Sequence, residues 1–401
     1  MPFSPNEGKC LTKGRSLQIK AGIFMKIGIV TEYFYPTLGG ITENIYHFSR
    51  ELLRLGHDFR IITGRGDDPG EIDPEVRRRM IFLGRSIPVF FNGSCGRATV
   101  GIGLTRKMRE VLGSEGFDII HAHSPVFPTL PMIANLQANA PVVGTFHTCT
   151  GRNLIYYRAY RKSAQNLIDR MAGRIAVSEC CARENNSFFK GHFDVIPNGV
   201  DVCWWTDGAK RIPRFDDGTV NVLFLGRPDT RNGLDTLIAA FARVHRARPR
   251  TRLIVVGDGP LRFHFERQVP EEAKKAVFFE GAASDSRPDY LATADIFCFL
   301  PTIASFGVTI LEGMSAGRAI IASDIEAFRD LLKHEESALL CPPGDVDALS
   351  ASILRLVDDP QLREKTGVSA RAHVGRYDWP RVAVQHIEYY NRILGETGTG
   401  D

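Results

Sequence analysis

The chain of 401 residues lacks any apolar run near the roughly 18 residues that a membrane-spanning helix needs. Its eight cysteines include no C-x-x-C pair, and only Cys180 and Cys181 are adjacent. This spacing argues against a zinc site or a disulfide framework and indicates a reducing compartment. The first 24 residues lack the apolar segment of a signal peptide, so we expect a disordered leader, with Met25 as a candidate start.

The chain also lacks a dominant charge. The net charge is +4 while 24% of the residues are charged, which is too mild to indicate nucleic acid without a local basic surface. Hydrophobic residues make up 43% of the sequence. A chain of this length and composition can bury a large core and is long for one domain, so two domains are expected.

Short apolar segments alternate with helical segments. In the first half we expect strands at Lys26–Tyr33, Phe59–Thr63, Phe117–His121, Pro141–Thr145, Arg174–Val177 and Asp194–Ile196. In the second half we expect strands at Val220–Leu225, Arg252–Val256, Ala276–Glu280, Asp295–Leu300 and Ala319–Ala322. The helical segments between and after them include Ile41–Leu55, Thr105–Leu112, Ile155–Met171, Leu234–Arg246 and Trp379–Ile393. This alternation predicts two doubly wound α/β domains with parallel sheets covered on both faces.

Residues 301–318, PTIASFGVTILEGMSAGR, are the most informative stretch. They lead from a strand end through the turn Ser305-Phe306-Gly307 into an apolar helix that carries one carboxylate, Glu312. A helix that begins in such a turn presents unpaired N–H groups and a positive dipole end, which suit a diphosphate. Glu312 lies about one and a half turns further, where it can accept hydrogen bonds from a ribose diol.

Two further motifs follow strands. Gly39-Gly40 lies between a strand and a helix, where missing side chains let a ligand approach the backbone, although an ordinary tight turn is the alternative. No G-x-G-x-x-G follows, which disfavours nicotinamide cofactors. His121 and His123 point the same way on an extended segment, so a metal pair is conceivable. No third ligand with suitable spacing is evident, so no metal site is predicted.

The 301–318 stretch closely resembles the signature of retaining, nucleotide-sugar-dependent glycosyltransferases of family 4. Three other segments share the resemblance: Thr145–His147, Pro197–Asp201 and Val256–Pro260. The resemblance covers Met25 to about Gly395, and within the family the chain resembles phosphatidylinositol mannosyltransferases. It implies the GT-B fold, two facing Rossmann-like domains with a C-terminal crossover helix. The expected parts are a leader (1–24), an acceptor-side domain (25–200), a linker (201–217), a nucleotide-sugar domain (218–377) and a crossover helix (378–401).

The resemblance implies roles for individual residues and exposes two departures. In the family two glutamates stand eight positions apart, and Ala304 replaces the first of them. The loop Gly226–Gly233 corresponds to the one whose Arg and Lys hold the donor diphosphate, which stabilises charge on the leaving group without a metal. Arg227 matches the Arg, although a solvated loop residue is the alternative, and Asn232 replaces the Lys with Arg231 beside it.

The other implied roles concern the phosphates, the sugar and the ribose. Ser305, Phe306, Gly307 and Val308 would hold the diphosphate through backbone amides, and Glu312 would hold the ribose. His123 matches a histidine that lies at the sugar, although a histidine that caps a strand end is the alternative. Gly39 and Gly40 would meet the phosphates or the acceptor. The only Asp-x-Asp, Asp345 to Asp347, looks like a helix cap.

Basic residues in the first half indicate an acceptor surface. Asn92 to Arg97 resembles the loop before the membrane-docking helix of the phosphatidylinositol mannosyltransferases, and the next helix carries Arg106, Lys107 and Arg109. Residues 156–162 interleave tyrosines with bases. Such a mixture suits anionic lipid, and a solvated basic helix face is an equal alternative. Nucleic acid is a third option, but no nucleic-acid module is recognisable.

These observations lead to one hypothesis with two alternatives. The chain is read as a retaining hexosyltransferase that uses GDP-mannose or a UDP-hexose, requires no cofactor and modifies a lipid acceptor. It would be cytoplasmic and peripheral at the inner face of the membrane. The first alternative, motivated by Ala304 and Asn232, is a degenerate member that binds a nucleotide sugar or glycan without transfer. The second is a transferase with a soluble glycan acceptor.

Overall fold

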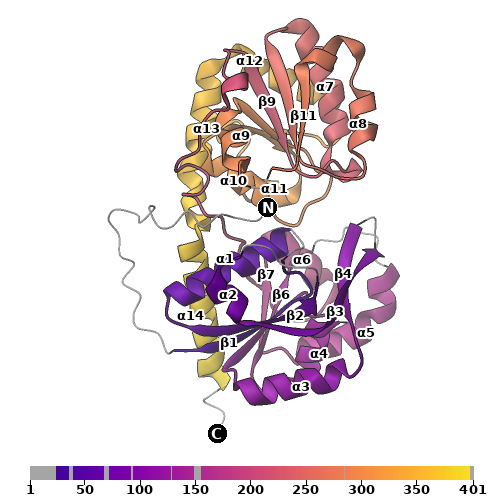
Figure 1. Cartoon of the computed structure of the whole chain (residues 1–401), viewed down its shortest axis with the longest axis vertical. Helices are drawn as coiled ribbons and strands as arrows, with labels where there is room; N and C mark the ends of the chain where they lie inside the picture. Colours follow the sequence, from indigo (N-terminus) through magenta and orange to yellow (C-terminus); the bar gives the residue numbers. More distant parts are fainter. Residues whose placement is uncertain are drawn as a thin grey trace. The chain divides into compact units, whose positions relative to one another are not determined.

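The computed structural model describes residues 24–35, 39–66, 72–91, 94–127, 129–148, 155–283 and 285–397. The chain forms two compact units. Unit 1 consists of Met1–Gly199 with Trp379–Asp401, and unit 2 consists of Val200–Asp378. Both units have the α/β architecture that the sequence predicts, each with one sheet and helices packed on it (Figure 1).

Unit 1 contains an eight-stranded sheet in the order β4-β3-β2-β1-β5-β6-β7-β8. The strands are β1 Lys26–Val30, β2 Asp58–Arg65, β3 Met80–Phe91, β4 Ser94–Val100, β5 Ile119–His123, β6 Val142–Phe146, β7 Gly173–Ala176 and β8 Asp194–Val195. All neighbouring pairs are parallel except β3 and β4. Every strand expected in this half of the sequence is present, with ends shifted by a few residues.

The β3–β4 hairpin corrects the sequence analysis. Residues up to Arg97 were expected to form a loop before a helix, but Ser86 to Phe91 pair antiparallel with Ser94 to Thr99. Arg97 therefore lies in strand β4, where its guanidinium donates to the hydroxyl and carbonyl oxygens of Ser86 at 3.0 and 3.3 Å. Asn92 and Gly93 lie outside the described residues.

Helices cover both faces of the unit 1 sheet. They are α1 Gly40–Arg54, α2 Pro74–Arg78, α3 Leu104–Glu115, α4 Leu130–Gln137, α5 Ile155–Asp169, α6 Glu179–Phe188 and α14 Trp379–Thr397. Helices α1 and α14 pack on one face and α3 and α4 lie on the other (Figure 1). The α1–α14 face buries Phe48, Phe59 and Tyr390 almost completely. Each large apolar side chain buried in this way contributes about 1.5–3 kcal/mol to folding.

Unit 2 contains a six-stranded, wholly parallel sheet in the order β11-β10-β9-β12-β13-β14. The strands are β9 Val220–Leu225, β10 Thr251–Val256, β11 Val277–Gly281, β12 Ile296–Phe299, β13 Ala319–Ser323 and β14 Leu339–Cys341. The α-helices are α7 Leu234–Ala247, α8 Arg262–Gln268, α9 Arg287–Thr293, α10 Val308–Ser315, α11 Glu326–Arg329, α12 Val346–Asp358 and α13 Pro360–Val374. Asp345 caps α12 by accepting from the Ala348 amide at 2.9 Å, as expected.

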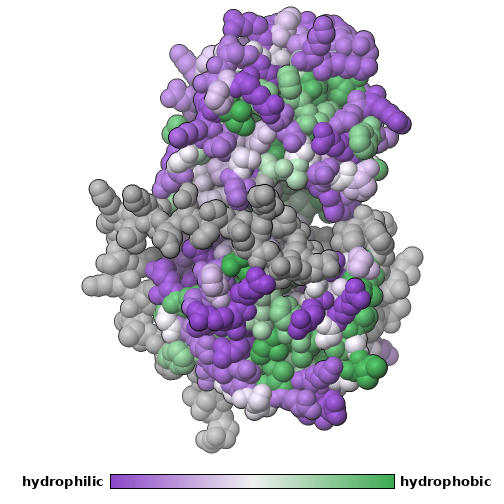
Figure 2. Space-filling view, in the orientation of Figure 1, coloured by the Kyte–Doolittle hydropathy of each residue, from purple (hydrophilic) through white to green (hydrophobic). Residues whose placement is uncertain are grey.

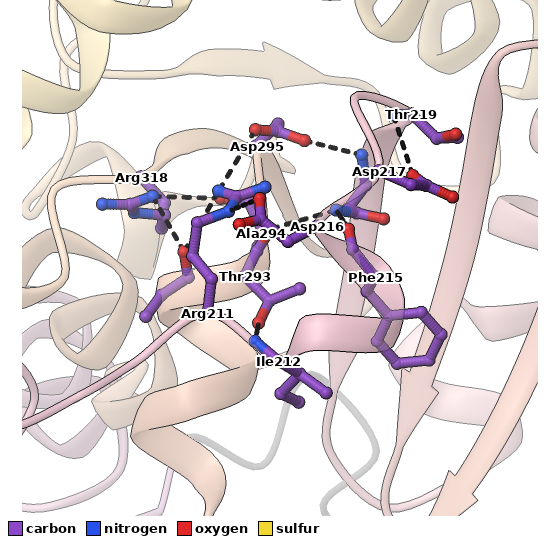
Figure 3. A network of polar contacts seen from close by, with 12 residues as sticks. Arg211, Ile212, Phe215, Asp216, Asp217, Thr219, Thr293, Ala294, Asp295 and Arg318 are labelled. Carbon is purple, nitrogen blue, oxygen red and sulfur yellow. Dashed lines mark hydrogen bonds and ion pairs between the residues drawn. The ribbon is translucent and has the colours of Figure 1, made fainter.

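The segment from residue 201 to 217, expected to be a linker, lies within unit 2. Polar contacts hold it against the amino ends of β9 and β12 (Figure 3). Arg211 pairs with Asp216 at 2.6 Å and with Asp295 at 3.6 Å, and the Ile212 amide donates to the Thr293 hydroxyl at 2.8 Å. These contacts join the segment to the sheet before β9 begins.

The structure also bears on the cysteines and on membrane-spanning helices. Cys180, Cys181, Cys298 and Cys341 are free and buried thiols. Cys203 is disulfide-bonded, whereas the spacing of the cysteines argued against a disulfide framework. Among the described helices, none is long and apolar enough to cross a membrane.

Candidate functional site

The first group of predicted site residues lies at the carboxyl edge of the unit 2 sheet. The loops after β9, β10 and β12 pack against each other there. The Thr302 amide donates to the Arg231 carbonyl at 3.0 Å, and the Gly226 amide donates to the Val256 carbonyl at 2.9 Å. Carboxyl ends of parallel strands are where open α/β sheets bind ligands.

Two glycines allow this close packing. Gly257 has φ of 142°, and a Cβ there would collide with the Gly226 carbonyl oxygen. Gly233 has φ of 70°, and a Cβ there would collide with the Leu300 carbonyl oxygen. Both positions therefore require glycine for conformational and steric reasons.

Helix α10 lies where the sequence predicts an anion site. It begins at Val308 after Gly307, whose φ is 113°. The Ile310 amide donates to the Gly307 carbonyl at 2.9 Å, and the two amides before it, of Val308 and Thr309, have no acceptor within the helix. Phe306 is buried and packs edge-to-face on Tyr377 at 6.0 Å between ring centroids, which fixes the turn before the helix. Ser305 is half-buried. The turn and the helix are confirmed as predicted.

Glu312 is buried inside α10, with 5% of its surface exposed. Its Oε1 atom accepts from Nη2 of Arg287 at 2.5 Å. The Arg287 guanidinium lies over the ring of Trp205, 5.0 Å from the centroid. The ion pair offsets the desolvation of the buried carboxylate, which would otherwise cost several kcal/mol.

Sequence reasoning missed Arg287 and Trp205. They lie 25 and 107 positions before Glu312 in the chain, so no local pattern connects the three residues. The contact joins α9, where Arg287 is the first residue, to α10, which carries Glu312. The one signal in the sequence is that Arg287 is a basic residue at the start of a helix, where the helix dipole disfavours positive charge.

Two arginines flank one aspartate in the loop after β9. Arg227 Nη2 lies 3.5 Å from Asp229 Oδ2, and Arg231 Nε lies 3.7 Å from Asp229 Oδ1. Both arginine side chains are about half exposed. Asn232 donates through its amide to the Arg227 carbonyl at 2.8 Å, so it stabilises the loop and adds no charge. The loop thus holds two cations, Arg227 and Arg231.

Ala304 directly precedes the turn that leads into α10, and it is half-buried. Its neighbour Ile303 is 58% exposed. At position 304, where the resemblance predicts a carboxylate, the chain carries a methyl group, and the sec-butyl group of Ile303 lies beside it in the sequence. No hydrogen bond to a ligand can come from these two side chains.

The second group of site residues lies in unit 1 on β5 and β6. His121 and His123 point to the same face, as predicted, with ring centroids 4.3 Å apart. His123 Nδ1 lies 2.8 Å from Nε2 of His147. His121 contacts the Thr145 hydroxyl at 2.6 Å and the Tyr390 hydroxyl at 2.7 Å. Among the residues that the structure describes, no cluster of three or more metal-binding side chains is found.

Burial keeps these histidines neutral. Desolvation lowers the pKa of His147 to about 3 and that of His386 to about 4. Desolvation also holds the pKa of His121 and of His123 well below the usual range, with neighbouring histidines adding to the effect. The group therefore acts through hydrogen bonds and not through positive charge at neutral pH.

The stability of unit 1 is expected to fall as the pH drops below about 6.5, the ordinary histidine pKa. Below this pH the histidines bind protons in the unfolded chain but stay neutral in the folded one. Each histidine therefore lowers the free energy of unfolding by about 1.4 kcal/mol per pH unit. Urea unfolding followed by a probe in unit 1 would measure this slope between neutral and acidic pH. His386→Gln should reduce the slope by about one histidine's share. An unchanged slope would contradict the assignment.

The remaining predicted residues occupy separate positions in unit 1. Gly39 precedes the first residue of α1, Gly40, and no atom lies within 4 Å of a Cβ built at Gly39. The preceding turn residues 36–38 are outside the described chain. A buried carboxylate that the sequence did not single out, Glu32, accepts from the Thr99 hydroxyl at 2.6 Å and the Leu130 amide at 2.8 Å. Desolvation raises its pKa.

The predicted basic surface is on α3. Arg106, Lys107 and Arg109 are all exposed, and Arg109 donates to the Gln137 side chain at 2.8 Å. Exposed apolar side chains lie nearby: Ile102, just before α3, is 94% exposed, and Leu136, on the neighbouring helix α4, is 43% exposed. Figure 2 shows apolar surface beside hydrophilic surface over this part of unit 1. Residues 156–160 are helical, but their side chains are not described.

Two family models together match most of the chain. The model "Glycosyltransferase Family 4" matches residues 38–203, and the model "Glycosyl transferases group 1" matches residues 207–373. The seam between the matches falls at residues 204–206, close to the boundary between units 1 and 2.

Named relatives and solved structures agree with these matches. The phosphatidyl-myo-inositol mannosyltransferase of Mycolicibacterium smegmatis is 30% identical over 378 residues, 92% of this chain and 95% of that protein. The phosphatidyl-myo-inositol mannosyltransferase of Mycobacterium tuberculosis is also 30% identical, with 92% and 98% covered. A glycosyltransferase structure from Rickettsia africae superposes with a TM-score of 0.74 at 18% identity, with 93% and 99% covered, which shows the same fold.

Proposed function

Because the chain belongs to the family 4 glycosyltransferases of the GT-B type, we propose that it transfers a hexose from a nucleotide diphosphate sugar. The sugar would be of the mannose or glucose type, from GDP-mannose or a UDP-hexose. The acceptor would be a lipid or a glycan, and the anomeric configuration would be retained.

One observation carries the proposal for the donor. The amino end of α10 and the cation-bearing loop after β9 lie at the same edge of the unit 2 sheet, joined by the Thr302–Arg231 hydrogen bond. Helix amides and two arginines would hold the diphosphate, and Glu312, buried five positions into α10, would accept from the ribose diol. Such an arrangement suits a nucleotide diphosphate.

The same groups would stabilise the diphosphate when it departs. Cleavage of the sugar–phosphate bond leaves a nucleoside diphosphate with an additional negative charge. Arg227, Arg231 and the α10 amides would stabilise that charge from fixed positions, so neither a metal nor another cofactor is required in the proposed scheme. The acceptor hydroxyl would attack the face of the sugar from which the diphosphate departs, which retains the configuration.

Calorimetric titration with GDP-mannose, UDP-glucose and the free nucleotides tests the donor proposal. We expect one of the two nucleotide series to bind and its sugar to appear in a product once an acceptor is added. Absence of binding by every nucleotide sugar would contradict the proposal. Binding without product, for any lipid or glycan acceptor, would favour the second candidate, a degenerate member that binds without transfer, which Ala304 and Asn232 motivate.

The cation loop gives a further prediction. Arg231→Gln should weaken binding of the nucleoside diphosphate about tenfold and leave binding of the nucleoside unchanged, because only the phosphates lose a charged hydrogen bond. Asn232→Lys should strengthen diphosphate binding, since it adds the missing cation. Arg243→Gln, on the surface of α7, serves as the matched control. Equal binding of the diphosphate by Arg231→Gln and the parent would show that Arg231 does not face the phosphates.

A lipid acceptor follows from the relatives and from the surface of α3. The two mycobacterial relatives are phosphatidyl-myo-inositol mannosyltransferases, whose acceptor is a lipid. Exposed bases on α3 next to exposed Ile102 suit the headgroup region of an anionic bilayer, where cations meet phosphates and an apolar side chain reaches the acyl boundary. We propose that the protein is cytoplasmic and peripheral to the inner face of the membrane.

Membrane attachment is expected to be electrostatic. Changing Arg106, Lys107 and Arg109 together to glutamine should weaken co-sedimentation with vesicles containing acidic lipid about a hundredfold, at about 1 kcal/mol per base. Added salt should have the same effect, and Ile102→Ser should weaken binding further. The control changes three ion-paired arginines of unit 2 to glutamine: Arg243, Arg246 and Arg248. Salt-insensitive binding, or equal loss in both triple variants, would favour a soluble glycan acceptor.

A further inference from the structure

A direct hydrogen bond between two histidines is the feature of unit 1 that the proposed function does not use. His123 ends β5, and His147 lies just beyond the end of β6, the next strand in the sheet. Nδ1 of His123 and Nε2 of His147 are 2.8 Å apart, with the rings 17° from parallel. This distance requires a proton between the two nitrogens.

Both rings are neutral, so each carries one N–H group. Burial lowers the pKa of both side chains, which removes the doubly protonated forms at neutral pH. One ring therefore donates and the other accepts, and the tautomer of His123 is tied to that of His147. If His147 donates, His123 carries its own proton on Nε2. If His147 accepts, Nε2 of His123 is bare.

The Nε2 atom of His123 is the second observation. His123 is 2% exposed, and within the described parts of the chain its buried Nε2 has no hydrogen-bond partner. The adjacent His121 differs, because both its ring nitrogens contact hydroxyl groups, of Thr145 and Tyr390. A buried polar atom without a partner is costly, and it indicates a place where a ligand or water completes the site.

We propose that His147 is a positioning residue whose Nε2–H donates to Nδ1 of His123, so that His123 offers an Nε2–H donor to a hydroxyl oxygen of the substrate. The assignment of His123 to substrate rests on the proposed transfer reaction. The tautomer itself does not. In this role His123 neither accepts a proton from the acceptor nor carries positive charge.

The direction of the hydrogen bond follows from the chemistry of imidazole. A neutral histidine side chain in water carries its proton more often on Nε2 than on Nδ1. With His147 as donor, both rings keep this favoured form. The reverse direction would force both rings into the Nδ1–H form and would leave a buried lone pair, not a proton, facing the substrate.

Nitrogen NMR of the full chain labelled in its histidine side chains tests the tautomer at neutral pH. Two-bond proton–nitrogen correlations distinguish a protonated from a bare ring nitrogen, and His123→Gln assigns the signals. We expect His123 to show a protonated Nε2 and a bare Nδ1. A protonated Nδ1 on His123 would overturn the proposal.

Variants of His147 test its positioning role. His147→Leu removes the donor, so His123 should change to a mixture of tautomers, and kcat should fall about tenfold with little change in the KM for the donor. His147→Gln, whose amide nitrogen falls near the place of Nε2, should restore the tautomer and most of the rate. His386→Gln, which changes a neighbouring histidine bonded only to its own helix among the described contacts, should leave the His123 signals in place.

The outcomes separate this inference from the proposed function. Unchanged His123 signals in His147→Leu would overturn the positioning role even in an active transferase. The predicted tautomer in a chain with no transferase activity would support the histidine pair and count against the reaction. If His147→Leu does not fold, His147→Asn serves instead, because its shorter amide does not reach His123.

Discussion

Glu312→Ala is expected to weaken binding of the nucleotide sugar at least tenfold. A carboxylate that accepts from a ribose diol contributes on the order of 1.5–3 kcal/mol per hydrogen bond, and tenfold corresponds to about 1.4 kcal/mol. The substitution also leaves the Arg287 guanidinium without its 2.5 Å partner, so the loss would be larger than from the ribose contact alone. Calorimetry with the preferred nucleotide sugar measures the change.

A conservative variant and a control separate these effects. Glu312→Gln keeps the shape and one acceptor oxygen, so it should lose less affinity than alanine. Glu335→Ala removes an exposed glutamate of unit 2 that pairs with Arg355, and donor affinity should not change. Unchanged affinity in Glu312→Ala would remove the basis for placing the ribose at α10.

Ala304→Glu is expected to raise kcat/KM about tenfold or more if the chain is a weakened transferase. The family resemblance implies that the acid at this position contacts hydroxyls of the transferred sugar, so glutamate would add roughly one charged hydrogen bond. Asn232→Lys in the same chain should increase the rate further by adding charge beside the leaving group. Initial rates with the competent donor measure both steps.

The opposite result is equally informative. Ile303 and Ala304 form an apolar rim, with Ile303 58% exposed. In a pocket reshaped around alanine, the new glutamate would gain nothing, or it would lose activity as a carboxylate without a partner. No rate gain on any competent donor would defeat the weakened-transferase hypothesis, whereas a clear gain would defeat binding without transfer.

The hydrophobic pattern was sufficient to predict the parallel parts of the two sheets, because buried parallel strands appear in the sequence as continuous apolar runs. The β3–β4 hairpin was missed because the second half of β3 and all of β4 are not buried parallel strands. Residues 86–91 pair only with β4, and Pro88 lies among them. Proline interrupts a strand pattern, yet it is tolerated where one side of the strand has no partner. The three-residue strand β14 was too short to give a pattern.

The site could be predicted only in its local parts. The turn and helix around Glu312 are contiguous in sequence, so motif and structure agree. Contacts between residues that are far apart in the sequence could not be predicted. Arg287 reaches Glu312 from another helix, and His147 reaches His123 from the next strand. Each depends on which strands are neighbours, and spacing along the chain does not fix that order.

The anomeric configuration of the product tests the central claim, retaining transfer from a nucleotide sugar, most directly. The full chain would be incubated with the donor chosen by calorimetry and with vesicles containing phosphatidylinositol, and the proton coupling at the new linkage would be measured. An α-linked product from the α-linked donor, formed in step with release of the nucleoside diphosphate, is the predicted result. A β-linked product, or a bound donor that is never consumed with any lipid or glycan acceptor, would contradict it.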